Sequence, residues 1–186
     1  MLKETGFVEA SGLQPEATPE WDRAVPSDGC LPRPQIQALT RVLETFTTTP
    51  DRCWFCIWDG WGFWWADAHS PLYPPDVDPE EVAAYRRRAE EQDQLLRGTP
   101  RVHAEARSYF LFRGPLSAAS LFEFEGWYQS PNLWWAQDRA WVVATEIDAY
   151  ATYIGGSREC VDRILAASEL EALEVGPDTR MDPGPF

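Results

Sequence analysis

The chain has 186 residues, which is enough for one domain with a substantial core and short for two. Its 30 acidic and 16 basic residues give a formal charge of −14, which repels phosphate backbones and anionic membrane surfaces and so argues against binding to nucleic acid or to a membrane. We expect a cytoplasmic protein, because no apolar run approaches the roughly 20 residues of a membrane span and the N-terminus lacks the pattern of a signal peptide.

Composition divides the chain into an arm, a domain and a tail. Residues 1–30 are rich in Pro, Glu, Gly, Ser and Thr, and we expect an extended N-terminal arm without a core of its own. Residues 31–175 are predicted to form a single α+β domain, within which residues 76–99 are a peripheral helical excursion. Residues 176–186, with three prolines, are predicted to be a C-terminal tail.

Two helices are predicted in the first half of the chain. One spans residues 34–46, where apolar residues recur at helical spacing until a threonine run and Pro50 end the pattern. The other begins at Asp78, a capping residue followed by Pro79, and continues to Leu96. Its apolar stripe is thin, which favours a mostly solvated helix.

The remaining elements are mainly strands. Residues 53–58 are apolar at every position, which indicates a strand that is covered on both faces. Asp59 and Gly60 end it. Further predictions are strands at 101–105, 108–112, 140–147 and 152–154, a short helix or bend over 117–124, and a C-terminal helix capped by Ser157. Short turns between consecutive strands require antiparallel pairing. The sequence therefore predicts an α+β fold: a mostly antiparallel sheet with helices packed on one side and a Trp-rich core.

Eight of the ten tryptophans lie in two clusters, five within residues 53–65 and three within residues 132–141. Indole rings bury large areas but also stack well on ligands, so the clusters indicate either an unusually aromatic core or a recognition surface. If the clusters adjoin in the fold, they form an aromatic wall edged by charged residues. The candidate binding residues from this pattern are Trp58, Asp59, Trp61, Trp134, Trp135, Asp138 and Arg139.

Motifs of catalysis are absent from the sequence, and we assign no catalytic residue. His103 and Glu105 share one face of a predicted strand, where they line a cleft or form its solvent side. Residues 155–157 join a strand to a helix with two glycines and a serine, a geometry that presents backbone N–H groups to an anion or serves the turn alone.

Cys53 and Cys56 form a C-x-x-C pair that invites a redox or zinc interpretation. In a strand, however, residues three apart point to opposite faces, so the two sulfurs cannot share a metal or a disulfide. We expect buried, reduced thiols, with no metal and no cofactor.

Several short motifs resemble a family of hypothetical proteins from actinobacteria, a family without an assigned activity. They are C-W-F at 53–55, W-D-G-W-G at 58–62, Y-F-L-F-R-G-P-L at 109–116, N-L-W-W at 132–135, D-R-A-W at 138–141 and T-Y-I-G-G-S at 152–157. The resemblance covers residues 31–175 and implies no site residues. In size, acidity and element order the chain is also, more loosely, similar to bacterial immunity proteins of the SMI1/KNR4-like type.

Two functional hypotheses follow. The first is a non-catalytic, immunity-like module that binds a basic protein partner, on the grounds of acidity, tryptophan content and missing catalytic motifs. The alternative is a small-molecule-binding protein or enzyme whose pocket is walled by Trp58, Trp61, Trp134 and Trp135, with His103, Glu105 or Asp138 as its polar groups.

Overall fold

The computed structural model describes residues 2–6, 29–61, 78–104, 107–124, 127–149, 151–176 and 179. The chain divides into two compact units. Unit 1 comprises Met1–Phe55 and Arg113–Phe186, and unit 2 comprises Cys56–Phe112. Unit 1 is thus formed by both ends of the chain, and unit 2 is inserted between them.

The described part of the chain confirms the α+β class. It contains the helices α1 (Arg33–Glu44), α2 (Pro79–Leu96) and α3 (Arg158–Leu165) and the 3₁₀ helix η1 (Leu116–Ser120). Its strands are β1 (Leu2–Gly6), β2 (Cys53–Trp58), β3 (Arg101–Ala104), β4 (Arg107–Gly114), β5 (Glu123–Phe124), β6 (Trp127–Tyr128), β7 (Leu133–Ala136), β8 (Trp141–Thr145), β9 (Ala151–Gly156) and β10 (Leu173–Glu174).

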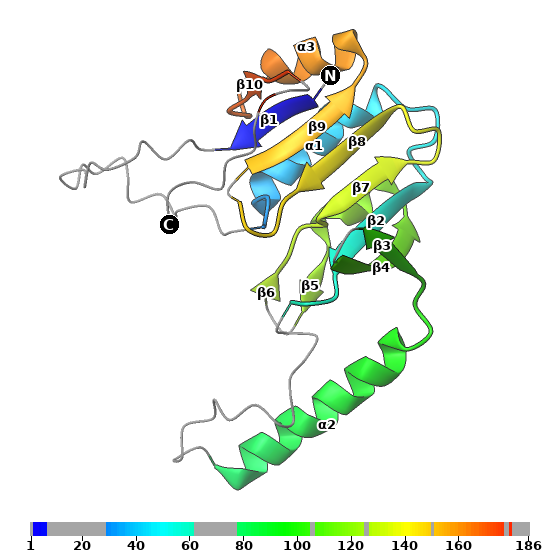
Figure 1. Ribbon diagram of the computed structural model, residues 1–186, viewed down its shortest axis with the longest axis vertical. Helices are drawn as coiled ribbons and strands as arrows, with labels where there is room; N and C mark the ends of the chain where they lie inside the picture. The colour runs from blue at the N-terminus through cyan, green and yellow to red at the C-terminus, as the bar shows by residue number, and fades with distance from the viewer. Residues whose placement is uncertain are drawn as a thin grey trace, which may run out of the picture. The chain divides into compact units, whose positions relative to one another are not determined.

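The sheet of unit 1 has the strand order β10-β1-β9-β8-β7-β2 (Figure 1). The pairings from β10 through β7 are antiparallel, with Trp134 opposite Val143 and Val143 opposite Ile154. Strand β1 comes from the stretch predicted to be an extended arm, yet its backbone pairs with both β9 and β10. Strand β7 falls inside the second tryptophan cluster, for which the sequence indicated no strand.

The helices of unit 1 pack on one face of this sheet. Helix α1 turns Ile36, Leu39 and Leu43 inward at helical spacing, and all three are fully buried. It is flanked by η1 and α3 and lies behind β8 and β9 in Figure 1. The indole Nε1 of Trp141 on β8 donates to the Leu43 carbonyl at 3.1 Å, which joins α1 to the sheet. This arrangement confirms the predicted one-sided helix layer.

A buried polar cluster fixes the segment that leads into α1. Leu31 N donates to Ser130 Oγ at 2.7 Å, and the Gln129 side chain donates to the Gly29 carbonyl at 2.9 Å. Asn132 Nδ2 also reaches the Gly29 carbonyl, at 3.3 Å. Because buried backbone groups need partners, these side chains hold residues 29–31 against the segment that precedes β7.

Unit 2 contains the C-terminal half of β2, helix α2, strand β3 and strand β4 as far as Phe112. Strands β3 and β4 pair antiparallel, with Val102 opposite Tyr109. Helix α2 begins as predicted, with the Asp78 carboxylate accepting the Glu80 N–H at 2.9 Å. In the part of the chain that the structure describes, no helix is both long and apolar enough to cross a bilayer.

One predicted element needs correction. The helix or bend expected over 117–124 is the 3₁₀ helix η1, which ends at Ser120. Glu123 and Phe124 instead form β5, which pairs antiparallel with β6 in a separate two-stranded sheet. Local spacing could not reveal this short hairpin, because two-residue strands carry too little periodicity.

Candidate functional site

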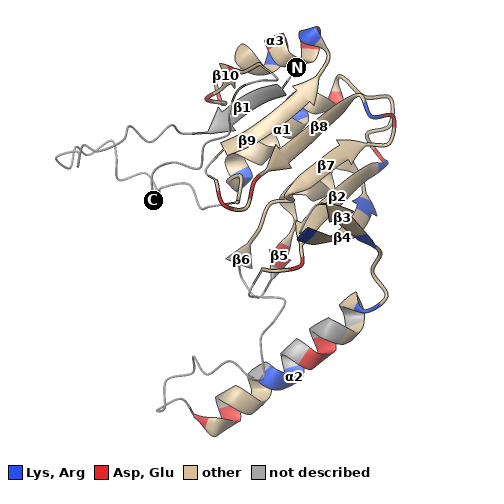
Figure 2. Cartoon of the chain, viewed as in Figure 1, with Lys and Arg blue, Asp and Glu red and all other residues tan. Residues whose placement is uncertain are grey.

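The central strands of unit 1 carry no charged residue. The sequences of β7, β8 and β9 are LWWA, WVVAT and ATYIGG, and these strands are tan along their length in Figure 2, whereas charges lie on helices, turns and other strands such as β5. An antiparallel sheet with helices on one face ordinarily alternates apolar residues with polar ones on the other face. Here neither face carries a charge, and Thr145 and Thr152, which are buried, bond to each other at 2.9 Å.

One face is the core. Trp134 and Trp141 are buried, at 0% and 1% exposure, and their rings meet edge to face with centroids 5.4 Å apart. Phe55 of β2 stacks on Trp134 with ring centroids 6.2 Å apart. Within the described residues the Trp134 Nε1 has no hydrogen-bond partner. The candidate Trp134 is therefore a core residue, and its indole is not presented at the surface.

The opposite face is partly exposed, and we call it the aromatic face. Alternation along each strand places there the residues that flank the core positions. They are Trp54 of β2, Leu133 and Trp135 of β7, Val142 and Ala144 of β8, and Tyr153 of β9. The two tryptophan clusters thus adjoin in unit 1, as the hypothesis of an aromatic wall requires, but through Trp54, Phe55, Trp134 and Trp135.

Two polar side chains fix the orientation of Trp54 on this face. Its Nε1 donates to Gln137 Oε1 at 2.8 Å. The Arg113 guanidinium carbon lies 5.5 Å from the centroid of its ring, within the range of cation–π attraction. The indole is therefore held in one orientation.

Asp138 organises the turn after β7. Its carboxylate accepts hydrogen bonds from Thr48 N at 2.7 Å, from Thr48 Oγ1 and Thr47 Oγ1 at 2.9 Å, and from Ala140 N at 3.2 Å. Partial burial raises the pKa of this carboxyl, but these hydrogen bonds together outweigh that effect and hold the pKa at about 2. Asp138 thus links two loops of unit 1, and much of its acceptor capacity is already used.

An open hollow lies at the end of the sheet where the β7–β8 turn meets the end of β9. Its volume is about 680 Å³. It is lined by Trp135, Arg139, Ala140, Trp141, Val142, Gly155 and Gly156. Since it shares Trp135 and Val142 with the aromatic face, it is continuous with that face.

Unit 2 holds the remaining aromatic candidates. Trp58 and Trp61 meet edge to face with centroids 5.5 Å apart, and the Trp58 indole occupies the space that a side chain at position 60 would need. Glycine is thereby required at position 60. Asp59 lies 3.5 Å from Arg101 Nε, and the Arg101 guanidinium in turn lies over the ring of Phe110. Asp59 is therefore part of an ion pair within unit 2.

The predicted pair of His103 and Glu105 is described only at its first member. His103 is exposed on β3, and Glu105 lies outside the described residues. The prediction that the two line a cleft stays a prediction.

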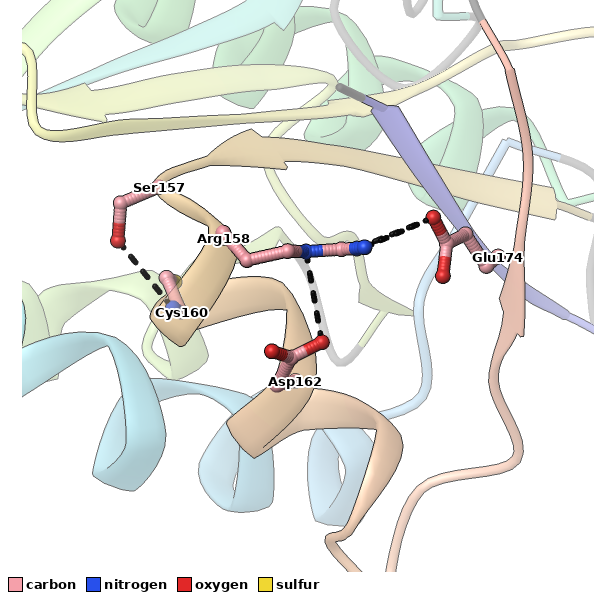
Figure 3. Close-up of polar contacts among 5 residues, drawn as sticks. All are labelled: Ser157, Arg158, Cys160, Asp162 and Glu174. Carbon is pink, nitrogen blue, oxygen red and sulfur yellow. Dashed lines mark hydrogen bonds and ion pairs between the residues drawn. The ribbon is translucent and has the colours of Figure 1, made fainter.

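At the junction between β9 and α3, the polar groups of Ser157 and Arg158 bond to nearby residues of the protein (Figure 3). The Ser157 side chain accepts the Cys160 N–H at 3.2 Å and caps α3. Arg158 contacts Glu174 of β10 at 3.0 Å and Asp162 at 3.4 Å. The first turn of α3 is thus occupied by a cap and bordered by carboxylates, which favours a structural role over anion binding.

The cysteines of β2 are buried, reduced thiols. Burial raises the pKa of Cys53 to about 11, with the negative charges of Asp138 and Asp51 adding to the effect, and burial alone raises the pKa of Cys56 to about 12. Among the described residues no group of three His, Cys, Asp or Glu side chains could hold a metal ion.

Comparison with protein-family models, with curated proteins and with solved structures gives no match, so the interpretation of the site rests on its geometry.

The sequence predicts Trp135 and Arg139 as binding residues but not Trp54, Val142 or Tyr153. A signal was present: the strands flanking the second cluster contain no charged residue on either face. That pattern indicates a second apolar surface once the helices are known to cover only one side.

Proposed function

We propose that this protein is a non-catalytic binding module whose aromatic face contacts a partner protein. The observation that carries the proposal is the uncharged, partly exposed face of four adjacent strands, which holds Trp54 and Trp135 where solvated polar residues are usual. Tryptophan and tyrosine supply much of the binding free energy at protein interfaces, because they bury large areas with little loss of side-chain freedom.

The partner we propose is a basic protein. A net charge of −14 attracts a positively charged molecule over several ångströms and speeds its encounter with this one. The aromatic face itself is uncharged, so it would supply the short-range contact while the acidic remainder of the molecule supplies the attraction. Neutralisation of a basic toxin, as in immunity proteins, is one activity of this kind.

Preorganisation supports the same proposal. Trp54 is already oriented by Gln137 and Arg113, so binding would not have to order that side chain. Arg113 at the margin of the face could pair with an acidic group of the partner once contact is made.

The test compares matched variants. Trp135→Ala removes an indole from the aromatic face, and Leu121→Ala removes an apolar side chain that is 71% exposed next to η1, away from that face. Wild type and both variants are immobilised and incubated with lysate of the source cell. Proteins that are retained in different amounts by the three forms are identified by mass spectrometry. Each protein identified in this way is then purified and titrated against wild type, Trp135→Ala and Leu121→Ala.

We expect a basic protein whose Kd rises at least about tenfold in Trp135→Ala, as for an interface hot spot, and is unchanged in Leu121→Ala. Affinity that depends on Leu121 and not on Trp135 would place the interface elsewhere and contradict the proposal.

A further inference from the structure

We propose that the hollow at the β7–β8 turn binds a small planar monocarboxylate, with Arg139 pairing with the carboxylate and Trp135 stacking on the ring. The hollow shares Trp135 with the aromatic face, but the proposal does not rest on the partner protein and its test uses none. Its volume of about 680 Å³ falls within the range of small-molecule sites, roughly 300–1,000 Å³.

The backbone at Arg139 is the first argument. Arg139 has φ 56°, and among the described residues it is the one non-glycine residue with positive φ. Its N–H closes the turn by donating to the Ala136 carbonyl at 2.9 Å. A left-handed position of this kind favours glycine or asparagine, because a Cβ atom crowds the following carbonyl. The turn geometry by itself therefore does not favour arginine at this position.

The guanidinium of Arg139 is the second argument. The side chain is exposed and lines the hollow, and it makes no ion pair or hydrogen bond with any described residue. This is unexpected in a chain with 30 acidic residues. The adjacent Asp138 carboxylate is engaged by Thr47, Thr48 and Ala140 instead. Arg139 is thus available for an external carboxylate, which a guanidinium binds through two parallel hydrogen bonds.

The walls of the hollow select the shape of the ligand. Trp135 contributes an indole to the lining, and Gly155 and Gly156 on the next strand but one contribute backbone. A Cβ at Gly156 would lie 3.2 Å from the sulfur of buried Cys160, so glycine at this position is required by the packing of α3 on the core face and not by the hollow. An indole next to a glycine, which has no side chain, fits a flat ring better than a branched chain.

The charge of the ligand follows from the electrostatics. The hollow offers one cation in a molecule of net charge −14, so a single negative charge is matched and a second is repelled. A phosphate monoester carries about −1.5 to −2 charges at pH 7. A monocarboxylate is therefore preferred over an organic phosphate.

The probe is 2-naphthoate, followed by ¹H–¹⁵N NMR of the indole N–H groups, with neutral 2-naphthamide and dianionic naphthyl phosphate as comparison ligands. We expect saturable shifts of the Trp135 indole with 2-naphthoate and at least about tenfold weaker binding of the other two compounds, since loss of one charge-assisted pair changes affinity by about that factor.

Two variants separate binding from folding. Arg139→Gly removes the guanidinium and relieves the left-handed backbone, so its thermal midpoint should equal or exceed that of wild type while its preference for the carboxylate over the amide disappears. Arg163→Gln removes an exposed charge on α3 and should leave binding unchanged. Absence of saturable binding to wild type, or equal affinity of Arg139→Gly for 2-naphthoate, would overturn the proposal.

Discussion

At the scale of single residues, neighbouring tryptophans have opposite roles. Trp134 is fully buried and packs on Phe55 and Trp141, whereas Trp135, the next residue, is partly exposed on the aromatic face. The alternation of a strand imposes this division. A cluster of tryptophans in the sequence therefore supplies side chains both to the core and to the surface, so an aromatic core and a recognition surface are not exclusive interpretations of it.

Asp138 provides a prediction about acid stability. Its pKa falls from an ordinary value of 3.8 to about 2 on folding, so its contribution is complete above about pH 4 and is lost as pH falls toward 2. Because the carboxylate is largely exposed, we expect Asp138→Asn to cost only about 1 kcal/mol at pH 7. Urea denaturation of both forms at pH 7 and pH 3 measures this.

The difference between the two proteins should shrink at pH 3. An equal difference at both pH values would mean that the hydrogen bonds from Thr47 and Thr48 do not depend on the charge of Asp138.

The thiols of β2 give a second prediction. With pKa values of about 11 and 12, Cys53 and Cys56 hold very little thiolate at pH 8 and are also buried. We expect both to react with iodoacetamide more than about a hundredfold slower than an exposed cysteine of pKa about 8.5. Peptide mass spectrometry of the native protein measures the rates, and the same reaction in denaturant is the control. Rapid native labelling of Cys56 would show that β2 is not covered.

At the scale of elements, the sequence predicts those structures whose signals are local. Strand β2 has the predicted bounds of 53–58, and the Asp78 and Ser157 caps begin their helices as expected. Each rests on residues within a few positions of one another: an apolar run or a capping side chain.

The elements that were missed depend on distant partners. Strand β1 contains mostly polar residues and is a strand because its backbone pairs with β9 and β10. Strand β7 has tryptophans at consecutive positions, which hides the alternation between its two faces. For the same reason the hollow at the β7–β8 turn could not be predicted, since it joins Arg139 to glycines that follow it by 16 and 17 positions.

The Ser157 cap of α3 gives a prediction about the stability of that helix. Ser157→Ala leaves the Cys160 N–H without its acceptor, and we expect a loss of about 1 kcal/mol in the free energy of unfolding. Arg158→Ala is the control, because it removes exposed ion pairs with Glu174 and Asp162, each of which contributes less than about 1 kcal/mol. Urea denaturation of both variants gives the values. A larger effect of Arg158→Ala would show that the link between α3 and β10 matters more than the cap.

At the scale of the whole molecule, charge and aromatic surface are separated. The strands that carry the aromatic face have no charged residue, while the chain as a whole has a charge of −14. Attraction between separated charges is screened beyond about 8 Å at physiological salt. We therefore expect added salt to slow association with a basic partner far more than it speeds dissociation, which stopped-flow kinetics on the purified pair will measure.

Hydroxyl-radical footprinting of the complex tests the central claim most directly. Side-chain oxidation is compared between the free protein and its complex with the partner identified by the matched variants. The account predicts that Trp54, Trp135 and Tyr153 become protected, while Leu121 and Leu165 on the helix side react as before. Protection of Leu121 or Leu165 with unchanged oxidation of Trp135 would contradict it, because the partner would then bind the helix layer and not the aromatic face.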